Sequence, residues 1–212
     1  MNDLREVALE EVALEEGVLE EITLEDGYVA LEPMTQGRTK DLYEAGRDLA
    51  IWKWTTSNYC SSMAATETWV NTCLRNFANA EQQPFVIVDK RLNKVVGSTS
   101  YLNIALQHKV IEVGYTFLNP RAQRTYINRR CKLLLLTHAF ETLKLNRVAL
   151  QTHEKNQQSR RAILGIGAKF EGIHRYARIQ HDGSIRNSAF YSIIKSEWPA
   201  VKQALKQKVN KP

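Results

Sequence analysis

The segment IEVGYTFLNPRAQRTYINRRCKLLLLTH, from Ile111 to His138, identifies the architecture better than any other part of the chain. Alternating apolar residues predict a strand over Val110–Leu118, and the leucine-rich end predicts a long helix over Asn128–Leu143. The loop between them carries four arginines: Arg121, Arg124, Arg129 and Arg130. A helix start presents unpaired N–H groups and the positive end of a dipole, so this junction suits a phosphate-bearing ligand. The alternative is an exposed basic turn that binds nothing.

The flanking segments predict a mixed domain of strands and helices. Before the junction we expect strands at Tyr28–Glu32, Phe85–Asp89 and Val95–Asn103, and helices at Gly37–Asp48 and Ser62–Asn79. After it we expect strands at Arg147–Thr152, Lys169–Gln180 and Ser184–Ile194, a helix at Asn156–Ile166, and a short final helix capped by Ser196. This order predicts an α+β fold on a mixed, mostly antiparallel sheet of about six to seven strands, with one parallel crossover around the long helix.

Residues 1–26 form an acidic extension with a degenerate repeat of five residues: EVALE, EVALE, EGVLE and EITLE. A period of five fits neither a helix nor a strand, so we expect a flexible or loosely docked segment, or else a short helix. Residues 27–212 are then a single domain. Because the extension is acidic, that domain carries most of the positive charge and favours an anionic partner: a phosphorylated cofactor, an acidic peptide or nucleic acid. The alternative is a solvated basic surface.

Composition places the chain among soluble globular proteins. With 212 residues, of which 43% are hydrophobic, it can bury a full core. No apolar run approaches the roughly 18–20 residues that cross a bilayer, and the acidic start does not resemble a secretory signal. Three widely spaced cysteines predict free thiols and no metal site. We therefore expect a cytoplasmic protein without a membrane or metal partner.

Four segments, in this order, resemble the GNAT superfamily of N-acetyltransferases, and within it the RimJ/RimL-type branch. They are VVGSTSYLNI (Val95–Ile104), EVGYTFLNPRAQRT (Glu112–Thr125), NQQSRRAILGIGAKFEG (Asn156–Gly172) and DGSIRNSAFYSIIKSEWP (Asp182–Pro199). The resemblance implies the GNAT fold, with a V-shaped splay between the central strands. It also implies an acetyltransferase that uses acetyl-CoA as co-substrate, without a metal. The acceptor would be a primary amine of a protein N-terminus or a small molecule, acetylated by direct transfer in a ternary complex.

The same resemblance implies where acetyl-CoA binds. The pantetheine arm is expected between Val110–Leu118 and Arg147–Thr152, and the pyrophosphate at Gln123–Asn128. Backbone N–H groups near Tyr115–Phe117 are expected to bind the thioester carbonyl. The residues implied in cofactor binding are Tyr115, Thr116, Phe117, Gln123, Arg124, Thr125, Tyr126, Ile127, Asn128, Arg129, Asn156 and Ser159.

One position departs from the family pattern, because Tyr126 stands where relatives have a glycine. Glycine lets the backbone approach the pyrophosphate and adopt positive φ, whereas a tyrosine ring could occupy the place of the phosphate. This departure supports an alternative function, a degenerate GNAT-fold binding module associated with ribosomes or RNA and impaired in acetyl-CoA binding. Glu112, Asn156 and Ser159 favour the enzyme, for which we expect no nucleic-acid partner and consider a homodimer.

Acetyl transfer requires an uncharged amine and a proton for the departing thiolate. Glu112 is the candidate base. Strand alternation is expected to turn one set of neighbours to the core (Ile111, Val113, Tyr115 and Phe117) and Glu112 to the substrate side with Gly114 and Thr116. The alternative is an ordinary exposed glutamate.

The resemblance implies that Asn156 contacts pantetheine and that Ser159 protonates the thiolate. Helix capping is the alternative for both residues, with Asn156 as the N-cap and Ser159 completing the first turn. Further candidates for the acceptor pocket are His153, Glu154, His174, Tyr176, Arg178, Trp52, Trp54 and Tyr59, although aromatic core packing explains the last three equally well. His138, inside the leucine-rich helix, is expected to be a core residue.

Overall fold

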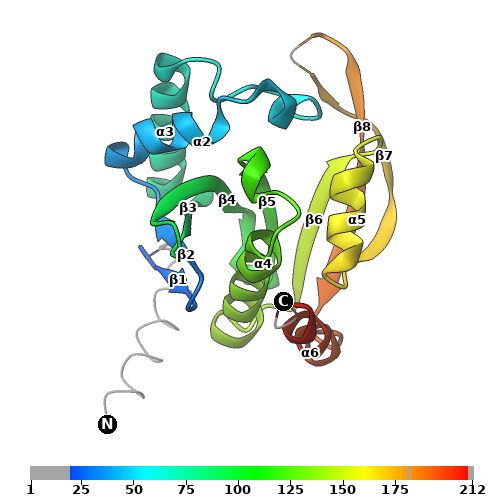
Figure 1. Ribbon diagram of the computed structural model, residues 1–212. Helices are drawn as coiled ribbons and strands as arrows, with labels where there is room; N and C mark the ends of the chain where they lie inside the picture. Colours follow the sequence, from blue (N-terminus) through cyan, green and yellow to red (C-terminus); the bar gives the residue numbers. More distant parts are fainter. Residues whose placement is uncertain (1–19, 181, 210–212) are drawn as a thin grey trace.

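The computed structural model describes residues 20–180 and 182–209, which form an eight-stranded sheet in the order β1-β2-β3-β4-β5-β6-β8-β7 (Figure 1). The strands are β1 (Leu24–Glu25), β2 (Val29–Pro33), β3 (Gln82–Asp89), β4 (Lys94–Ala105), β5 (Val110–Leu118), β6 (Arg147–His153), β7 (Lys169–Ile179) and β8 (Ile185–Ile194). Neighbours are antiparallel except β5 and β6, which are parallel. The predicted mixed sheet is confirmed, with slightly more strands than expected.

Five α-helices lie within the described residues: α2 (Thr39–Gly46), α3 (Met63–Ala78), α4 (Ile127–Thr137), α5 (Gln157–Gly165) and α6 (Trp198–Val209). Short 3-10 turns accompany them, including η2 (Leu49–Trp52), and a π turn at His138–Thr142 extends α4. Ser62 caps α3 as predicted, by accepting a hydrogen bond from the Ala65 N–H. Ser196 does not cap α6, because that helix begins two residues later. None of the helices in this part of the chain is both long and apolar enough to cross a membrane.

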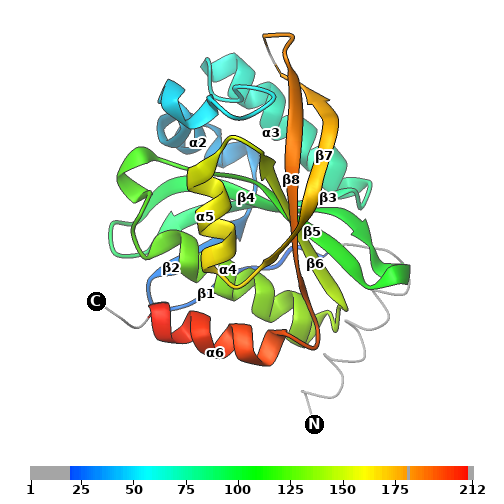
Figure 2. The ribbon, with the colours of Figure 1, turned by 90° about the vertical axis from the view of Figure 1, so that its right-hand side faces the viewer.

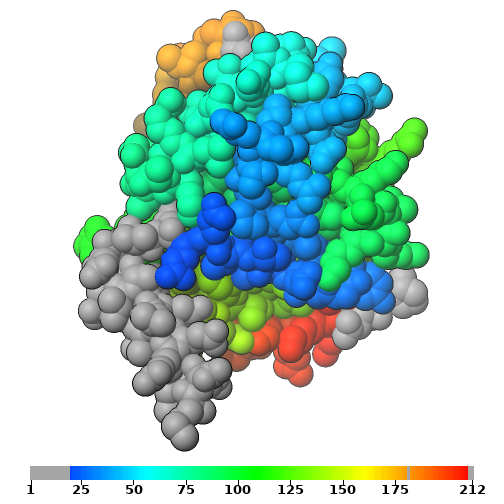
Figure 3. All heavy atoms as spheres, turned by 90° about the vertical axis from the view of Figure 1, so that its left-hand side faces the viewer, coloured from blue at the N-terminus to red at the C-terminus, as the bar shows by residue number. Residues whose placement is uncertain are grey.

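The helices cover both faces of the sheet. Figure 2 shows α4, α5 and α6 together on one face, and Figure 3 shows the opposite side, where α2 and α3 form the surface. Each face has its own apolar cluster. Ile111 and Val113 belong to the cluster beneath α4, whereas Phe117 belongs to the cluster with Trp52 and Trp69. Strand β5 therefore sends side chains into both cores.

A β-bulge in β5 explains this change of face. Ser98 of β4 lies opposite Phe117 and Ser100 lies opposite Gly114, so one residue of β4 faces two residues of β5. Tyr115, one of those two, has a φ of 45° and is 50% exposed. The prediction that Tyr115 and Phe117 share the core side of Ile111 was wrong, because the extra residue resets the alternation.

The central strands diverge after a short contact. Strands β5 and β6 pair only from Val110 to Glu112 and from Arg147 to Ala149. Beyond these residues they separate, as Figure 1 shows, while β6 keeps its pairing with β8 along its whole length. The predicted V-shaped splay is therefore present, and Glu112 lies at its vertex.

The end of the acidic extension belongs to the sheet. Strand β1 pairs with β2, and Ile22 and Leu24 pack against the core. Asp26 forms an ion pair with Arg130 of α4, with 2.7 Å between the charged atoms. The prediction of a loosely docked extension is thus wrong for residues 20–26. Most of the five-residue repeats lie outside the described residues.

Candidate functional site

A cleft of about 1230 Å³ opens where β5 and β6 diverge. Its walls come from β5, β6, the first turns of α4 and α5, and the segment around η2. Eight basic side chains line it against only two carboxylates, those of Glu81 and Glu112. The basic residues are Lys53, Arg124, Arg129, Lys132, Arg161, Arg178, Arg186 and Lys208. The cleft therefore suits a large anionic ligand.

Glu112 is held in one orientation at the vertex of the cleft. The Asn103 side-chain amide donates to its Oε2 over 2.8 Å, and the Gln151 amide donates to its Oε1 over 2.8 Å. The residue is only 5% exposed, yet it lines the cleft. Neutral amides bind it and no described cation forms an ion pair with it, so the carboxylate is oriented without a neighbouring counter-charge in contact with it. The alternative of an ordinary exposed glutamate does not fit this burial.

A buried lysine lies beside the bulge of β5. Lys132 of α4 donates from Nζ to the Thr116 hydroxyl over 2.9 Å, and the Thr116 and Thr99 hydroxyls are 2.7 Å apart. Burial lowers the pKa of Lys132 to about 8. A positive charge beneath the cleft floor is thus available wherever an anion or a polarised carbonyl lies above it.

The loop before α4 presents both amides and arginines to the cleft. The side chain of Tyr126, the N-cap of α4, makes no capping hydrogen bond. The Ile127 N–H donates to the Thr125 hydroxyl over 3.3 Å, which leaves the N–H groups of Asn128 and Arg129 for an anion. Arg124 has a φ of 60°, which turns the chain sharply just before the helix. The predicted loop residues that line the cleft are Gln123, Arg124, Thr125, Asn128 and Arg129.

Arg130, by contrast, faces away from this loop site. Its guanidinium lies 3.8 Å from the centre of the Tyr28 ring and pairs with Asp26. Neither Arg121 nor Arg130 lines the cleft. Two of the four arginines of the junction therefore contribute to the predicted anion site.

Tyr126 and Ile127, two of the residues implied in cofactor binding, do not line the cleft. The Tyr126 hydroxyl donates to Asp89 over 2.9 Å, and its ring packs edge-on against Tyr28. Its φ of −66° is in the right-handed region, so the position does not require glycine. Ile127 is 1% exposed in the core beneath α4. The tyrosine ring therefore does not occupy the place expected for a phosphate.

Asn156 and Ser159 line the other wall of the cleft, at the start of α5. Asn156 is the N-cap of that helix, because its Oδ1 accepts a hydrogen bond from the Ser159 N–H over 3.0 Å. The capping alternative is confirmed for Asn156. Ser159 itself is half-buried and lines the cleft.

The far end of the cleft combines aromatic and basic side chains. Trp52, Trp54 and Tyr59 line it together with Tyr115 and Phe117. Trp52 is largely core, with its indole N–H donating to the Gly46 carbonyl, whereas Trp54 packs edge-on against His153. The aromatic residues Trp52 and Tyr59 thus pack in the core and also form part of the cleft wall.

Among the remaining candidates, Arg178 lines the cleft. His153 and Glu154 do not line the cleft, although the His153 ring packs against Trp54, which does. His174 stacks on Phe190, and Tyr176 is 75% exposed outside the cleft. His138 is buried, as predicted, and burial lowers its pKa to about 4.

Sequence reasoning missed four groups that shape the site: Asn103, Lys132, Gln151 and Arg186. Lys132 follows Asn128 by four residues and Arg129 by three, so its helical spacing was a usable signal. Asn103 and Gln151 left no such signal. Asn103 reaches Glu112 from an irregular point in β4 where its φ is 47°, and Gln151 lies on a different strand.

Comparison with known proteins agrees with this architecture. Residues 29–169 match the family model described as "Acetyltransferase (GNAT) domain". The chain is 28% identical over 174 residues to the Bacillus subtilis protein named "Putative ribosomal N-acetyltransferase YdaF", covering 81% of this chain and 92% of that one.

Two solved structures show the same fold. A GCN5-related N-acetyltransferase from Brucella melitensis superposes with a TM-score of 0.84 at 28% identity, over 90% of this chain and 86% of that one. Mycobacterium smegmatis RimJ, solved in complex with CoA-disulfide, superposes with a TM-score of 0.75 at 16% identity, over 89% and 93%.

Proposed function

Because the chain belongs to the GNAT acetyltransferase family, with relatives in its RimJ/RimL-type branch, we propose that it transfers the acetyl group of acetyl-CoA to a primary amine of a protein N-terminus or small molecule. The observation that carries this proposal is the position of Glu112. Its oriented carboxylate lies at the vertex of a basic cleft, between a bulged strand and two helix starts.

The charges along the cleft fit coenzyme A. In the proposed complex the pyrophosphate lies at the start of α4, where amide groups and the side chains of Arg124 and Arg129 converge. Charge-assisted hydrogen bonds of this kind contribute about 1.5–3 kcal/mol each. Arg161 and Lys208, further along the same cleft, suit an additional phosphate. The pantetheine arm would occupy the space between β5 and β6.

The proposed reaction proceeds by direct attack. Glu112, directly or through a water molecule, removes a proton from the acceptor ammonium. The free amine attacks the thioester carbonyl carbon, so that a C–N bond forms and the carbonyl oxygen becomes an oxyanion, and the C–S bond then breaks as the carbonyl is restored. Backbone N–H groups of the bulge at Tyr115–Phe117 stabilise the oxyanion, since a bulge leaves its extra residue outside the strand ladder. The Ser159 hydroxyl gives a proton to the departing thiolate and takes one from the attacking nitrogen, which must lose a second proton to become the neutral amide.

The state of the cysteines supports transfer without a covalent enzyme intermediate. Burial raises the pKa of the Cys60 thiol to about 11 and those of Cys73 and Cys131 to about 12. None of the three lines the cleft. A nucleophilic cysteine needs the opposite environment, exposed and electropositive.

The binding-module alternative rested on Tyr126, and the orientation of its side chain removes that support. The ring lies against Tyr28, outside the cleft, and so does not block the loop Gln123–Asn128 where the pyrophosphate is proposed to bind. Together with the match to the family model, this favours the enzyme.

Thermal denaturation with acetyl-CoA tests the proposal. A ligand at about 100 times its dissociation constant stabilises the fold by about 2.7 kcal/mol, which raises the melting temperature by roughly 5–10 °C for a chain of this size. The double variant Arg124→Ala/Arg129→Ala should lose most of this shift. Arg121→Ala is the matched control, because Arg121 belongs to the same loop but lies outside the cleft. No shift at millimolar acetyl-CoA would contradict the proposed function.

A further inference from the structure

Two arginines face each other across the β7–β8 hairpin, at the far end of the cleft. Arg178 of β7 pairs in register with Arg186 of β8, and both side chains line the cleft. Like charges directly opposite on neighbouring strands destabilise a sheet. A bound anion between them would remove that repulsion.

Within the described residues, no carboxylate forms an ion pair with either arginine. Arg186 donates from Nη1 to the Trp54 carbonyl over 3.3 Å, but its Nε–H is buried without an acceptor. A buried donor without a partner lowers the stability of the fold, so an acceptor bound at the Arg186 Nε–H would be favourable.

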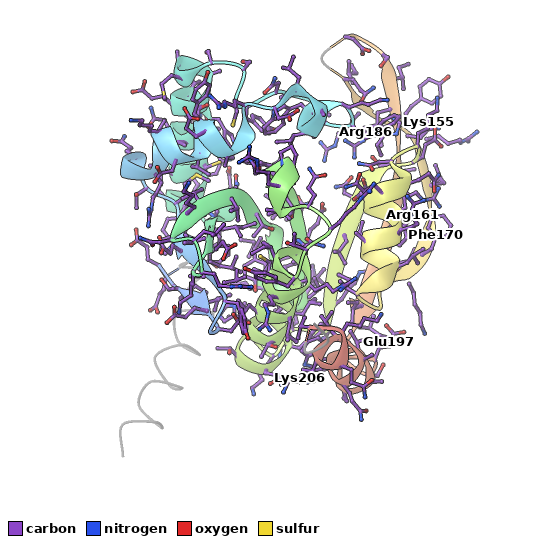
Figure 4. All side chains as sticks on the ribbon, viewed as in Figure 1. Lys155, Arg161, Phe170, Arg186, Glu197 and Lys206 are labelled. Carbon is purple, nitrogen blue, oxygen red and sulfur yellow. The ribbon has the colours of Figure 1, made fainter. Side chains whose placement is uncertain are left out.

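Arg186 lies within electrostatic range of the proposed base. Burial and the neighbouring Arg178 lower the pKa of Arg186, and the charge of Glu112 opposes them. Glu154, another carboxylate near this end, is instead bound by the Asn187 amide. Figure 4 shows Arg186 where β8 approaches the segment after η2. An anion held there would lie within electrostatic reach of the amine that Glu112 deprotonates.

We infer that Arg178 and Arg186 bind a carboxylate of the acceptor, so that the preferred acceptor is an amine with a carboxylate close to its amino group. The inference rests on the proposed function. Guanidinium groups bind carboxylates through paired, directional hydrogen bonds, which a neutral amide cannot match. Two sources offer this chemistry: the α-carboxylate of a free amino acid, and an acidic side chain near the N-terminus of a peptide.

Rates of CoA release with matched acceptors distinguish the two sources. One series uses peptides with amidated C-termini that carry Glu, Gln or Lys at each of the first three positions in turn. The other compares glycine with glycinamide. The carboxylate member of one series should exceed its amide counterpart by roughly ten- to hundredfold in kcat/KM. A preference in the first series identifies an acidic N-terminus, and a preference in the second identifies a free amino acid.

The double variant Arg178→Gln/Arg186→Gln should bring the ratio of carboxylate to amide acceptor close to one. Arg175→Gln is the control, because Arg175 is an exposed arginine of the same strand outside the cleft. A ratio of rates is insensitive to partial loss of folded protein. Equal rates in the wild type, or an unchanged ratio in the double variant, would overturn the carboxylate subsite alone. Failure of every amine, together with no thermal shift by acetyl-CoA, would instead contradict the proposed function.

Discussion

Individual side chains in the cleft owe their chemistry to the polar groups around them. Glu112 is held by two amides, which orient the carboxylate without adding a charge. Lys132 is held by two threonine hydroxyls and forms no ion pair with a described carboxylate. Each residue is therefore oriented by neutral partners beside the proposed meeting place of the thioester and the amine.

Glu112→Gln tests the proposed base directly. The substitution keeps the shape of the side chain and removes its proton acceptor, so kcat should fall by about 10²–10⁴ while acetyl-CoA binding is retained. The rise of kcat/KM with pH that reports an essential base should also disappear. Glu154→Gln is the control, since that carboxylate lies outside the cleft. An unchanged rate would show that another group accepts the proton.

Lys132→Met tests the buried charge through the pH dependence of stability. The folded pKa of about 8 lies below the ordinary value of 10.5, so between these values the unfolded chain binds more protons. The free energy of unfolding of the wild type should therefore rise relative to the variant by about 2–3 kcal/mol between pH 7 and pH 10. Chemical denaturation at several pH values measures this difference.

Lys195→Met provides the control, because Lys195 is an exposed lysine. Its difference from the wild type should stay flat over the same pH range. Parallel curves for the wild type and Lys132→Met would mean that Lys132 keeps its ordinary proton affinity in the folded protein.

At the scale of elements, the β4–β5 pair sets the geometry of the cleft. Next to the bulge at Tyr115 and Thr116, the backbone of β4 comes very close to that of β5 at Gly97. A Cβ atom on Gly97 would lie 2.1 Å from the Phe117 carbonyl oxygen. Only glycine allows the two strands to come this near. The position of the bulge therefore depends on β4 as much as on β5.

Gly97→Ala should consequently destabilise the fold by about 1–3 kcal/mol, and acetyl-CoA should stabilise the variant less than the wild type. Thermal melts with and without acetyl-CoA measure both effects. Gly37→Ala is the control, because an added Cβ there meets only the Thr35 hydroxyl oxygen at an ordinary 3.7 Å. Equal stability and equal ligand shifts would show that the strand contact yields without moving the bulge.

The same elements show what the sequence could predict. The bounds of β5 were predicted correctly, because its apolar pattern and flanking polar residues are local signals. The bulge within it was not predicted, since it depends on the register with β4. The opposition of Arg178 and Arg186 likewise depends on the hairpin register, which contains a shift of its own between His174 and Arg178. Local pattern thus predicted the walls of the site, and strand register determined which side chains meet there.

At the scale of the whole molecule, positive charge is concentrated along the cleft. Most basic side chains of the cleft come from α4, the loop before it, α5 and α6, where acetyl-CoA is proposed to bind. They are Arg124, Arg129, Lys132, Arg161 and Lys208. Fields of this kind attract an anionic ligand over a range that salt reduces. The affinity for acetyl-CoA should therefore be sensitive to ionic strength.

Titrations at two salt concentrations test this expectation. The dissociation constant of acetyl-CoA should rise roughly tenfold between about 0.05 and 0.5 M salt. That of acetyl-pantetheine, which lacks the phosphates, should change little. Similar salt dependence for both ligands would contradict phosphate binding by the basic residues.

The order of the strands has a consequence for how the protein is made. Strand β8 follows β7 in the chain but lies between β6 and β7, so β7 joins the sheet only through β8. During synthesis, β6 remains an open edge with unpaired backbone groups until the chain has been made as far as Ile194. Arg186 arrives with that last strand. The wall proposed to select the acceptor is therefore completed late, and a nascent chain can form the Glu112 side of the cleft before it can discriminate between amines.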